Sequence, residues 1–201
     1  MPTVLDWPLP YADRLAARAT SALRQVVIHC TELPDLATAR EYGERVLYRS
    51  GSGNSGHYYV DRDGRIYRFV PETRVAHHTR GHNDDSIGIE LVNRGRWPHW
   101  LDSRHQAMTE PYPPEQIAAL RALLDDLRTR LPMLRAIAGH EDLDRTQVPA
   151  SDDAQVLVAR KRDPGPLFPW AAVLAGSTWR RLHAPAGADA LTPAARGTDS
   201  P

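Results

Sequence analysis

Three residues that could hold a divalent metal ion lie far apart in the sequence, each where the chain is expected to be fixed. His29 ends the apolar run VVIH, and His140 follows the apolar residues and glycine of LRAIAGH. Asp163 lies in the proline-rich segment ARKRDPGPLFPW, where Pro164 disfavours helical geometry for the residue before it. Two imidazoles and a carboxylate are a typical ligand set of catalytic zinc, which keeps a further position open for water.

Two charged residues near these candidates could take part in the same chemistry. Glu90 lies in the apolar run SIGIELVN, where a carboxylate is costly to bury unless it is paired or functional. Lys161 precedes Asp163 by two positions and lies on the same side of an extended chain. Structural interpretations stay open at this point. His29 could be a hydrogen-bonded core histidine, and the lysine and aspartate could be solvated residues of a surface turn.

The candidates depend on strands that the hydrophobic pattern predicts. β-branched and apolar runs predict strands at residues 24–31 and 87–92, and a further short strand before His140. The segment HYYVDRDGRIYRFV predicts a β-hairpin that turns at Asp63 and Gly64. Polar groups gather at strand ends in open sheets, so the two histidines are expected to converge with the aspartate there.

Apolar residues at helical spacing predict helices at residues 36–47 and 114–131, and a short helical segment at 11–19. Two polar stretches separate the predicted elements. Residues 94–113 read as a long irregular connection, and residues 144–160 as an excursion from the domain. The helices are expected to cover the sheet and to carry no chemistry.

Composition restricts the class of protein. A chain of 201 residues that is 41% hydrophobic is long enough for one domain with a sizeable core. Its 25 basic and 25 acidic residues balance, so no basic field favours nucleic acid as a partner. One cysteine, Cys30, excludes an internal disulfide and a cysteine-rich zinc site. The chain lacks an apolar run of membrane-spanning length and its first residues lack a signal-peptide pattern, so we expect a cytoplasmic protein with no membrane partner.

Five segments resemble, in order, those of the type 2 N-acetylmuramoyl-L-alanine amidases: VVIHCT, SGHYYVDRDGRIYRFVPE, SIGIELVN, GHEDL and RKRDPGPLFPW. This zinc family includes anhydromuropeptide amidases, phage lysozyme-like amidases and peptidoglycan recognition proteins. The resemblance covers residues 24–170. It implies an α/β fold with a mixed central β-sheet flanked by helices and a zinc ion in a surface groove. We therefore expect a lead-in at 1–23, a zinc amidase domain at 24–176 and a disordered tail at 177–201.

The resemblance also implies roles for the candidate residues. His29, His140 and Asp163 are similar to the zinc ligands, Glu90 to the general base, and Lys161 to the cation that stabilises the transition state. The implied reaction is hydrolysis of the amide bond between N-acetylmuramic acid, or its 1,6-anhydro form, and L-alanine in peptidoglycan or muropeptides. The alternatives are a non-catalytic module that binds peptidoglycan and a metal-free structural domain.

The sequence departs from the family pattern in two places that could contact the substrate. The connection between the second histidine and the aspartate is longer than in compact members, and residues 146–158 could form a lid or a substrate wall. His77 stands where related sequences often carry tryptophan. Trp97 and Trp100 are expected either to pack in the domain or to form a platform for a sugar or peptide.

Overall fold

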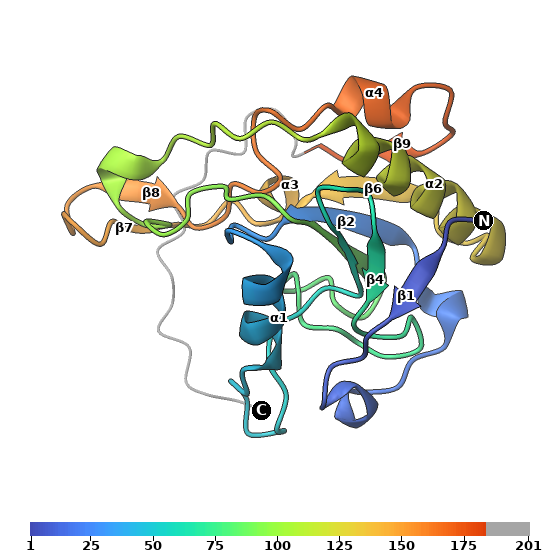
Figure 1. Cartoon of the computed structure of the whole chain (residues 1–201). Helices are drawn as coiled ribbons and strands as arrows, with labels where there is room; N and C mark the ends of the chain where they lie inside the picture. Colours follow the sequence, from blue (N-terminus) through green and yellow to red (C-terminus); the bar gives the residue numbers. More distant parts are fainter. Residues whose placement is uncertain (184–201) are drawn as a thin grey trace.

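A seven-stranded mixed sheet forms the centre of residues 1–183, the part of the chain that the computed structural model describes (Figure 1). Its strands, in spatial order, are β1 (Val4–Asp6), β4 (Ile66–Arg68), β3 (Tyr58–Val60), β5 (Ser86–Leu91), β2 (Gln25–Cys30), β6 (Ala136–Gly139) and β9 (Arg180–Arg181). β2 pairs in parallel with both β5 and β6, whereas β3 and β4 form an antiparallel hairpin. The predicted strands, the hairpin and the mixed α/β sheet are confirmed.

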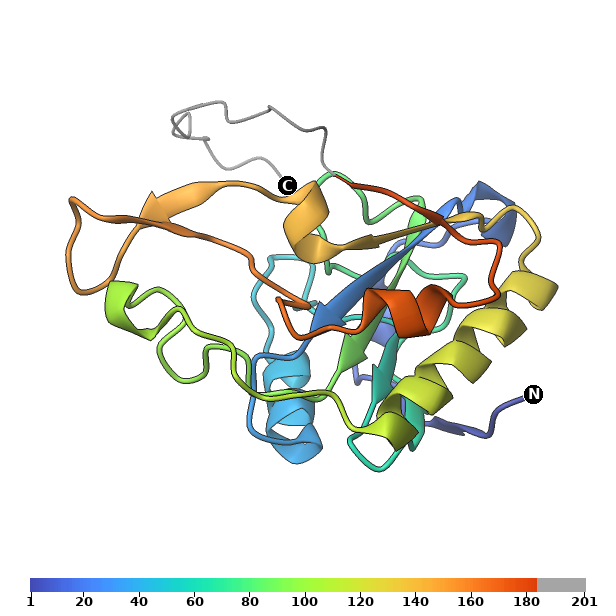
Figure 2. The same cartoon turned by 90° about the horizontal axis from the view of Figure 1, so that it is seen from above.

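Helices cover both faces of the sheet. α2 (Pro114–Arg130) and α4 (Trp170–Leu174) lie together above it in Figure 1, and α1 (Leu36–Glu44) lies below it; Figure 2 shows the same arrangement from above. α2 begins at Pro114, whose ring suits the first turn, and buries the predicted leucine stripe against the sheet. A short helix, α3 (His140–Leu143), follows β6. Three single 3₁₀ turns, at Ala12–Arg14, Thr20–Ala22 and Ser103–His105, complete the helical structure of residues 1–183.

The alternation of side chains along β2 and β5 separates the core from the candidate site. Alternate residues of the two strands enter the apolar core under α2: Val26, Ile28, Cys30, Ile87, Ile89 and Leu91. His29 and Glu90 occupy the intervening positions, so they lie on the opposite face. They are also register partners across the parallel pair. The backbone ladder therefore brings these two polar side chains together.

The predicted excursion between His140 and Asp163 forms a hairpin of its own. β7 (Gln147–Pro149) and β8 (Leu157–Ala159) make a separate two-stranded antiparallel sheet, which projects from the domain in Figures 1 and 2. The connection at residues 94–113 lies beside it, because the Ser103 backbone N–H and hydroxyl donate to the Asp152 carboxylate at 2.7 and 2.8 Å. The irregular connection is confirmed, and only one 3₁₀ turn interrupts it.

Two predicted helices differ from the structure. The segment at residues 11–19 holds a single 3₁₀ turn, because the backbone of residues 16–18 instead pairs with residues 73–75. Tertiary pairing here overrides local helical spacing. The helix predicted at 36–47 ends at Glu44, since the N–H groups of Leu47 and Tyr48 both donate to the carbonyl of Ser52 and turn the chain away.

The two ends of the described chain belong to the central sheet. β1 pairs in parallel with β4, and β9 pairs in parallel with β6. The first residues of the tail predicted at 177 are therefore ordered, because Trp179 packs in the core and Arg180–Arg181 joins the sheet. The remainder of that predicted tail, 184–201, lies outside the described residues. Within residues 1–183, no helix combines the length and the apolar character that crossing a bilayer requires.

A buried ion pair connects the end of β2 to the segment that carries Lys161. The Arg96 guanidinium binds both carboxylate oxygens of Glu32, at 2.7 and 2.9 Å, and their side chains are 1% and 9% exposed. Arg96 also donates to the carbonyl oxygens of Ala159 and Arg160 at 2.8 and 3.3 Å. One side chain thus links two segments, each of which supplies a candidate ligand a few residues away.

Replacing Arg96 with alanine should lower the free energy of unfolding by about 3–5 kcal/mol, because it leaves a buried carboxylate without its partner. Urea denaturation followed by circular dichroism measures the loss. The matched control is Arg45→Ala, which breaks an exposed pair with Glu41 and should cost less than about 1 kcal/mol. Equal losses in the two variants would contradict a structural role for the buried pair.

Candidate metal centre

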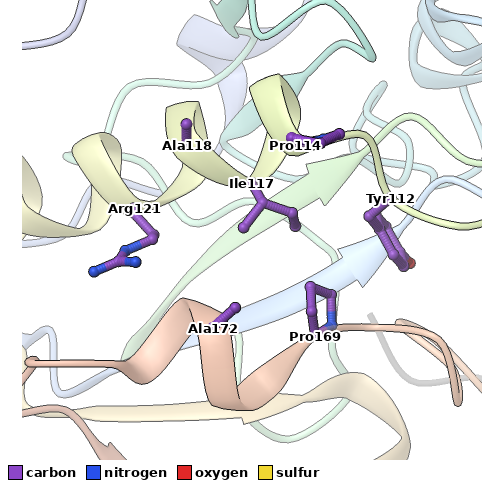
Figure 3. Close-up of a pocket in the computed structure, with 7 residues that line it drawn as sticks. All are labelled: Tyr112, Pro114, Ile117, Ala118, Arg121, Pro169 and Ala172. Carbon is purple, nitrogen blue, oxygen red and sulfur yellow. The ribbon is translucent and has the colours of Figure 1, made fainter.

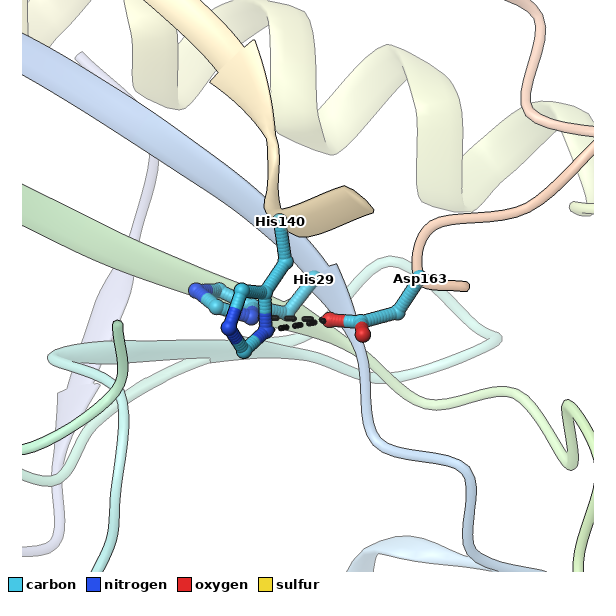
Figure 4. Close-up of side chains that lie close together, drawn as sticks. All are labelled: His29, His140 and Asp163. Atoms are coloured by element: carbon cyan, nitrogen blue, oxygen red, sulfur yellow. Dashed lines mark hydrogen bonds and ion pairs between the residues drawn. The ribbon is translucent and has the colours of Figure 1, made fainter. Parts of the chain in front are cut away.

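The side chains of His29, His140 and Asp163 converge on one point, although 134 residues separate the first from the last (Figure 4). Nδ1 of His29 lies 2.9 Å and Nδ1 of His140 lies 3.1 Å from the same oxygen, Oδ2 of Asp163. The three residues are only 2%, 2% and 3% exposed. Two imidazole nitrogens and a carboxylate oxygen therefore share a small, buried volume.

Neighbouring parallel strands place the two histidines side by side. Ile28 of β2 and Gly139 of β6 are register partners, so His29 and His140, the residues that follow them, lie side by side where β6 ends and α3 begins. The ring centroids are 4.6 Å apart. Asp163 reaches this edge from a loop that is held in two places. Its carbonyl accepts from the Glu141 N–H at 2.9 Å, and the Tyr112 hydroxyl donates to the Pro164 carbonyl at 2.7 Å.

The arrangement fits a divalent cation. Tetrahedral ligands at about 2.0–2.1 Å from a metal lie about 3.3 Å from one another, close to the spacing of the nitrogen and oxygen atoms here. Oδ1 of Asp163 is buried and has no hydrogen-bond partner in the protein. Buried polar atoms are rarely left in this state, and a cation beside the carboxylate would satisfy it. These three residues therefore form a cluster that could bind a metal.

The protonation states of the cluster suit a cation as well. Burial, and then the charge of His140, lower the pKa of His29 to about 4, so its imidazole is neutral at pH 7. Burial alone would raise the pKa of Asp163, but the charge and hydrogen bonds of the two histidines outweigh it and hold that pKa well below its usual range. A neutral imidazole and an ionised carboxylate are the forms in which these groups coordinate metal.

Glu90 borders the cluster, as the strand register requires. Its Oε1 lies 4.0 Å from Nδ1 of His29, and the side chain is 14% exposed. Burial and the charge of Asp163 raise the pKa of Glu90 well above its usual range, and the charge of Lys161 opposes this shift. A divalent cation at the cluster would oppose it further. Gly56 allows this packing, because a Cβ there would lie 2.8 Å from Cγ of Glu90.

Lys161 is partly exposed on the approach to Asp163. Its positive charge lowers the pKa values of both Glu90 and His29, so it acts on the same small region as the other four residues. The structure thus brings together all five residues singled out in the sequence. His29, His140 and Asp163 are in mutual contact. Glu90 borders these three, and the charge of Lys161 acts on the same region.

A hydrogen-bonded chain behind His29 sets the direction of its ring. Nε2 of His29 lies 3.0 Å from Nδ1 of His78, and Nε2 of His78 lies 3.1 Å from the Ser86 hydroxyl. The hydroxyl donates in turn to the carbonyl of His82. If Nδ1 of His29 faces a cation, its Nε2 carries the proton and every donor along this chain has an acceptor. A chain of this kind orients a metal ligand and selects its tautomer.

Close approach to the sheet makes this chain possible. Gly88 lies under the ring of His78, and a Cβ there would lie 2.6 Å from Cγ of the imidazole. His78 lies in the loop that precedes β5, and it supports a candidate ligand. His77 is partly buried against Tyr48, with ring centroids 5.0 Å apart. His82 lies beside the side chain of Gln25, at 3.2 Å.

Sequence reasoning did not identify His78, Glu32 or Arg96 as supports of the site. The doublet of histidines in AHHT gave the only signal for the first, and nothing local distinguished the buried ion pair. Trp97 and Trp100 were expected either to pack in the domain or to form a platform for a sugar or peptide, and packing is observed. Both tryptophans pack against a second cluster of buried apolar residues, which includes Leu33 and Ala39, and the indole of Trp100 donates to the Glu32 carbonyl at 3.0 Å.

An apolar groove of about 520 Å³ lies between α2 and α4, apart from the cluster (Figure 3). Neither a carboxylate nor an imidazole lines it, so its walls offer no ligand for a metal and no acid of the kind found beside His29. The lining residues are Tyr112, Pro114, Ile117, Ala118, Arg121, Pro169 and Ala172. The chemistry of the chain is therefore assigned to the histidine and carboxylate cluster.

Comparison with known proteins identifies the family. Residues 19–166 match the family model described as N-acetylmuramoyl-L-alanine amidase. The chain belongs to the N-acetylmuramoyl-L-alanine amidase family. The resemblance seen in the sequence is thereby confirmed, and with it the fold class. Within this amidase family, the chain is 32% identical over 173 residues to N-acetylmuramoyl-L-alanine amidase AmiD of Escherichia coli K12, a match that covers 78% of this chain and 54% of AmiD.

Solved structures of amidases share the fold. The structure of E. coli AmiD with the substrate anhydro-N-acetylmuramic acid-L-Ala-D-γ-Glu-L-Lys has a TM-score of 0.58 at 30% identity, and the match covers 80% of this chain and 59% of AmiD. N-acetylmuramoyl-L-alanine amidase LysC from Clostridium intestinale has a TM-score of 0.62 at 23% identity, covering 87% of this chain and 97% of LysC. The chain spans about half the length of the curated relatives it matches.

Proposed function

We propose that this chain is a zinc-dependent N-acetylmuramoyl-L-alanine amidase that hydrolyses the amide bond between N-acetylmuramic acid, or its 1,6-anhydro form, and L-alanine. The observation that carries the proposal is the convergence of His29, His140 and Asp163, with Glu90 4.0 Å from one ligand atom. Membership of the family supports the reaction, and the muropeptide bound to the related AmiD supports the substrate class.

The proposal assigns zinc to the two imidazoles and the Asp163 carboxylate, because two nitrogens and one oxygen leave a position open for water. Zinc in such a site acts as a Lewis acid and lowers the pKa of a water molecule toward about 7. His78 holds the ring of His29 in the orientation that presents Nδ1 to the ion. The loop bonds at Asp163 and Pro164 fix the third ligand in the same way.

Glu90 serves as the general base. Its carboxylate accepts a proton as the water oxygen attacks the lactyl carbonyl carbon, and it then delivers that proton to the departing amine of L-alanine. Burial raises the pKa of Glu90, and a divalent cation at the cluster would oppose that shift and favour the ionised carboxylate, the form that accepts a proton. Lys161 places its positive charge beside the oxyanion that forms at the carbonyl. The products are a lactyl carboxylate and a free stem peptide.

Removal of metal should abolish muropeptide cleavage, and added zinc should restore it. The measurement is release of the stem peptide by chromatography, before and after treatment with a chelator and after addition of one equivalent of zinc. A non-catalytic peptidoglycan-binding module would bind the muropeptide and release no peptide under any of these conditions. Cleavage that persists after complete removal of metal would overturn the zinc proposal.

The proposal extends to the substrate and to the limits of the domain. Anhydromuropeptides are the preferred substrates if the chain works in the cytoplasm, a location that stays a prediction from the sequence. Turnover of anhydro-capped fragments compared with whole sacculi tests that preference. The zinc amidase domain, predicted at residues 24–176, is assigned to residues 4–181, because β1 and β9 are strands of its central sheet. The segment at 146–158 is assigned to a wall beside the substrate.

A further inference from the structure

A second group of metal-ligating side chains lies on the surface, in the connection between β5 and α2. His99, Asp102 and His105 each offer one ligand atom, and these atoms lie within 4.8 Å of one another. Nδ1 of His105 is 3.2 Å from Oδ1 of Asp102, and the two histidine rings have centroids 4.6 Å apart. Within residues 1–183 this is the only such group besides the one proposed as the catalytic centre.

The backbone explains why the three side chains align. The N–H groups of His99, Asp102 and His105 donate to the carbonyls of Arg96, His99 and Asp102, at 2.8, 3.1 and 3.1 Å. Each bond closes a turn of four residues, and the last of these turns contains the 3₁₀ turn Ser103–His105. A turn brings its first and last residues close together. The turns at 99–102 and 102–105 therefore gather two imidazoles and one carboxylate in a small region.

The edge is accessible and the cluster has an acidic neighbour. His99 and His105 are exposed, whereas the side chain of Asp102 is only 12% exposed and is fixed by its hydrogen bond to the Arg104 N–H at 2.9 Å. The carboxylate of Asp152 lies close by on the turn of the β7–β8 hairpin. Two exposed imidazoles that can change rotamer beside one fixed carboxylate provide three ligands at little conformational cost.

Arg104 is the group that competes with a cation. Its guanidinium binds Asp102 at 2.8 Å and lies 3.4 Å from Asp152, but its side chain is 70% exposed. An exposed pair of this kind contributes little free energy, so Arg104 can move into solvent when a divalent ion arrives. One arginine also neutralises only one of the two carboxylates, which leaves the patch with a net negative charge.

We infer that His99, Asp102 and His105 form a second, surface site for a divalent transition metal such as zinc. Imidazole ligands favour zinc, nickel and copper, whereas calcium and magnesium favour all-oxygen sites. The ion would fix the turn at residues 99–105, against which the β7–β8 hairpin is bonded through Ser103. The site is separate from the catalytic centre and does not depend on the proposed function.

The test is the number of zinc ions bound by the full chain, prepared without a polyhistidine tag. Equilibrium dialysis against free zinc, with metal and protein measured in the same sample, should give two ions per chain for the wild type. His99→Gln and His105→Gln should each lose one ion. His183→Gln, which removes an exposed histidine outside the group, is the matched control and should lose none.

The result is read as a difference of one ion between the wild type and the glutamine variants, so it is independent of the catalytic centre. Equal zinc content in the wild type and both variants would overturn the surface site. Arg104→Gln adds a second measurement, because loss of the competing cation should lower the zinc concentration that half-fills this site. An unchanged or higher concentration would exclude Asp102 as a ligand.

Discussion

Replacing Glu90 with glutamine should lower kcat by about 10²–10⁴-fold while the protein keeps its zinc, because glutamine preserves the shape of the side chain and cannot accept the proton of the attacking water. The glutamate borders the candidate ligands without being one of them, at 4.0 Å from Nδ1 of His29. Muropeptide turnover and zinc content, measured on the same preparation, separate loss of the base from loss of the metal.

Glu141 provides the matched control for this variant. It is a second acid near the site, and burial followed by the charge of Asp142 raises its pKa to about 7. Glu90 lies on the strand face that carries His29, whereas Glu141 lies on α3, so Glu141→Gln should keep most of the turnover. If instead Glu90→Gln is fully active and Glu141→Gln is inactive, the roles of the two acids must be exchanged.

Replacing Asp163 with alanine should remove both the zinc and the activity. The variant keeps two imidazoles and loses the only carboxylate of the cluster, so its affinity should fall by more than the roughly 10–100-fold that accompanies loss of a group supporting a ligand. Zinc content after dialysis and muropeptide turnover should both approach background. Asp153→Ala, which removes an exposed aspartate on the β7–β8 hairpin, should change neither quantity.

Circular dichroism keeps this experiment interpretable, because Asp163 also forms hydrogen bonds with both histidines. Asp163→Asn is a second variant that preserves the size of the side chain and removes only its charge. A folded variant of either kind that retains a full equivalent of catalytic zinc and normal turnover would show that Asp163 is not a zinc ligand, and the ligand assignment would then be wrong.

The sequence predicted the central elements because their patterns are local. β2, β5 and α2 each bury a run or a stripe of apolar residues, and the period of that run decides between strand and helix. The same local pattern made Glu90 conspicuous, because a carboxylate breaks an otherwise apolar strand. His29 and Glu90 then meet as a consequence of parallel register, which the family resemblance anticipated and the residues alone left open.

The supports of the site could not be predicted, because they depend on contacts distant in the sequence. Arg96 and Glu32 are 64 residues apart, and His78 and His29 are 49 apart. His78 reaches its partner only because Gly88 of β5 leaves room for its ring, which no local pattern indicates. The failed helix at residues 11–19 has the same origin. Its backbone pairs with residues 73–75, more than 50 positions further along the chain.

The two ends of the segment that carries the β7–β8 hairpin are bonded to each other. The Arg160 N–H donates to the Thr146 carbonyl at 2.8 Å, and the Arg160 guanidinium pairs with Asp144, so the two ends of the excursion meet before the chain continues toward Asp163. Insertions or deletions beyond this closure leave the path from His140 to Asp163 unchanged. The length and sequence of this segment can therefore vary without altering the approach of Asp163 to His140.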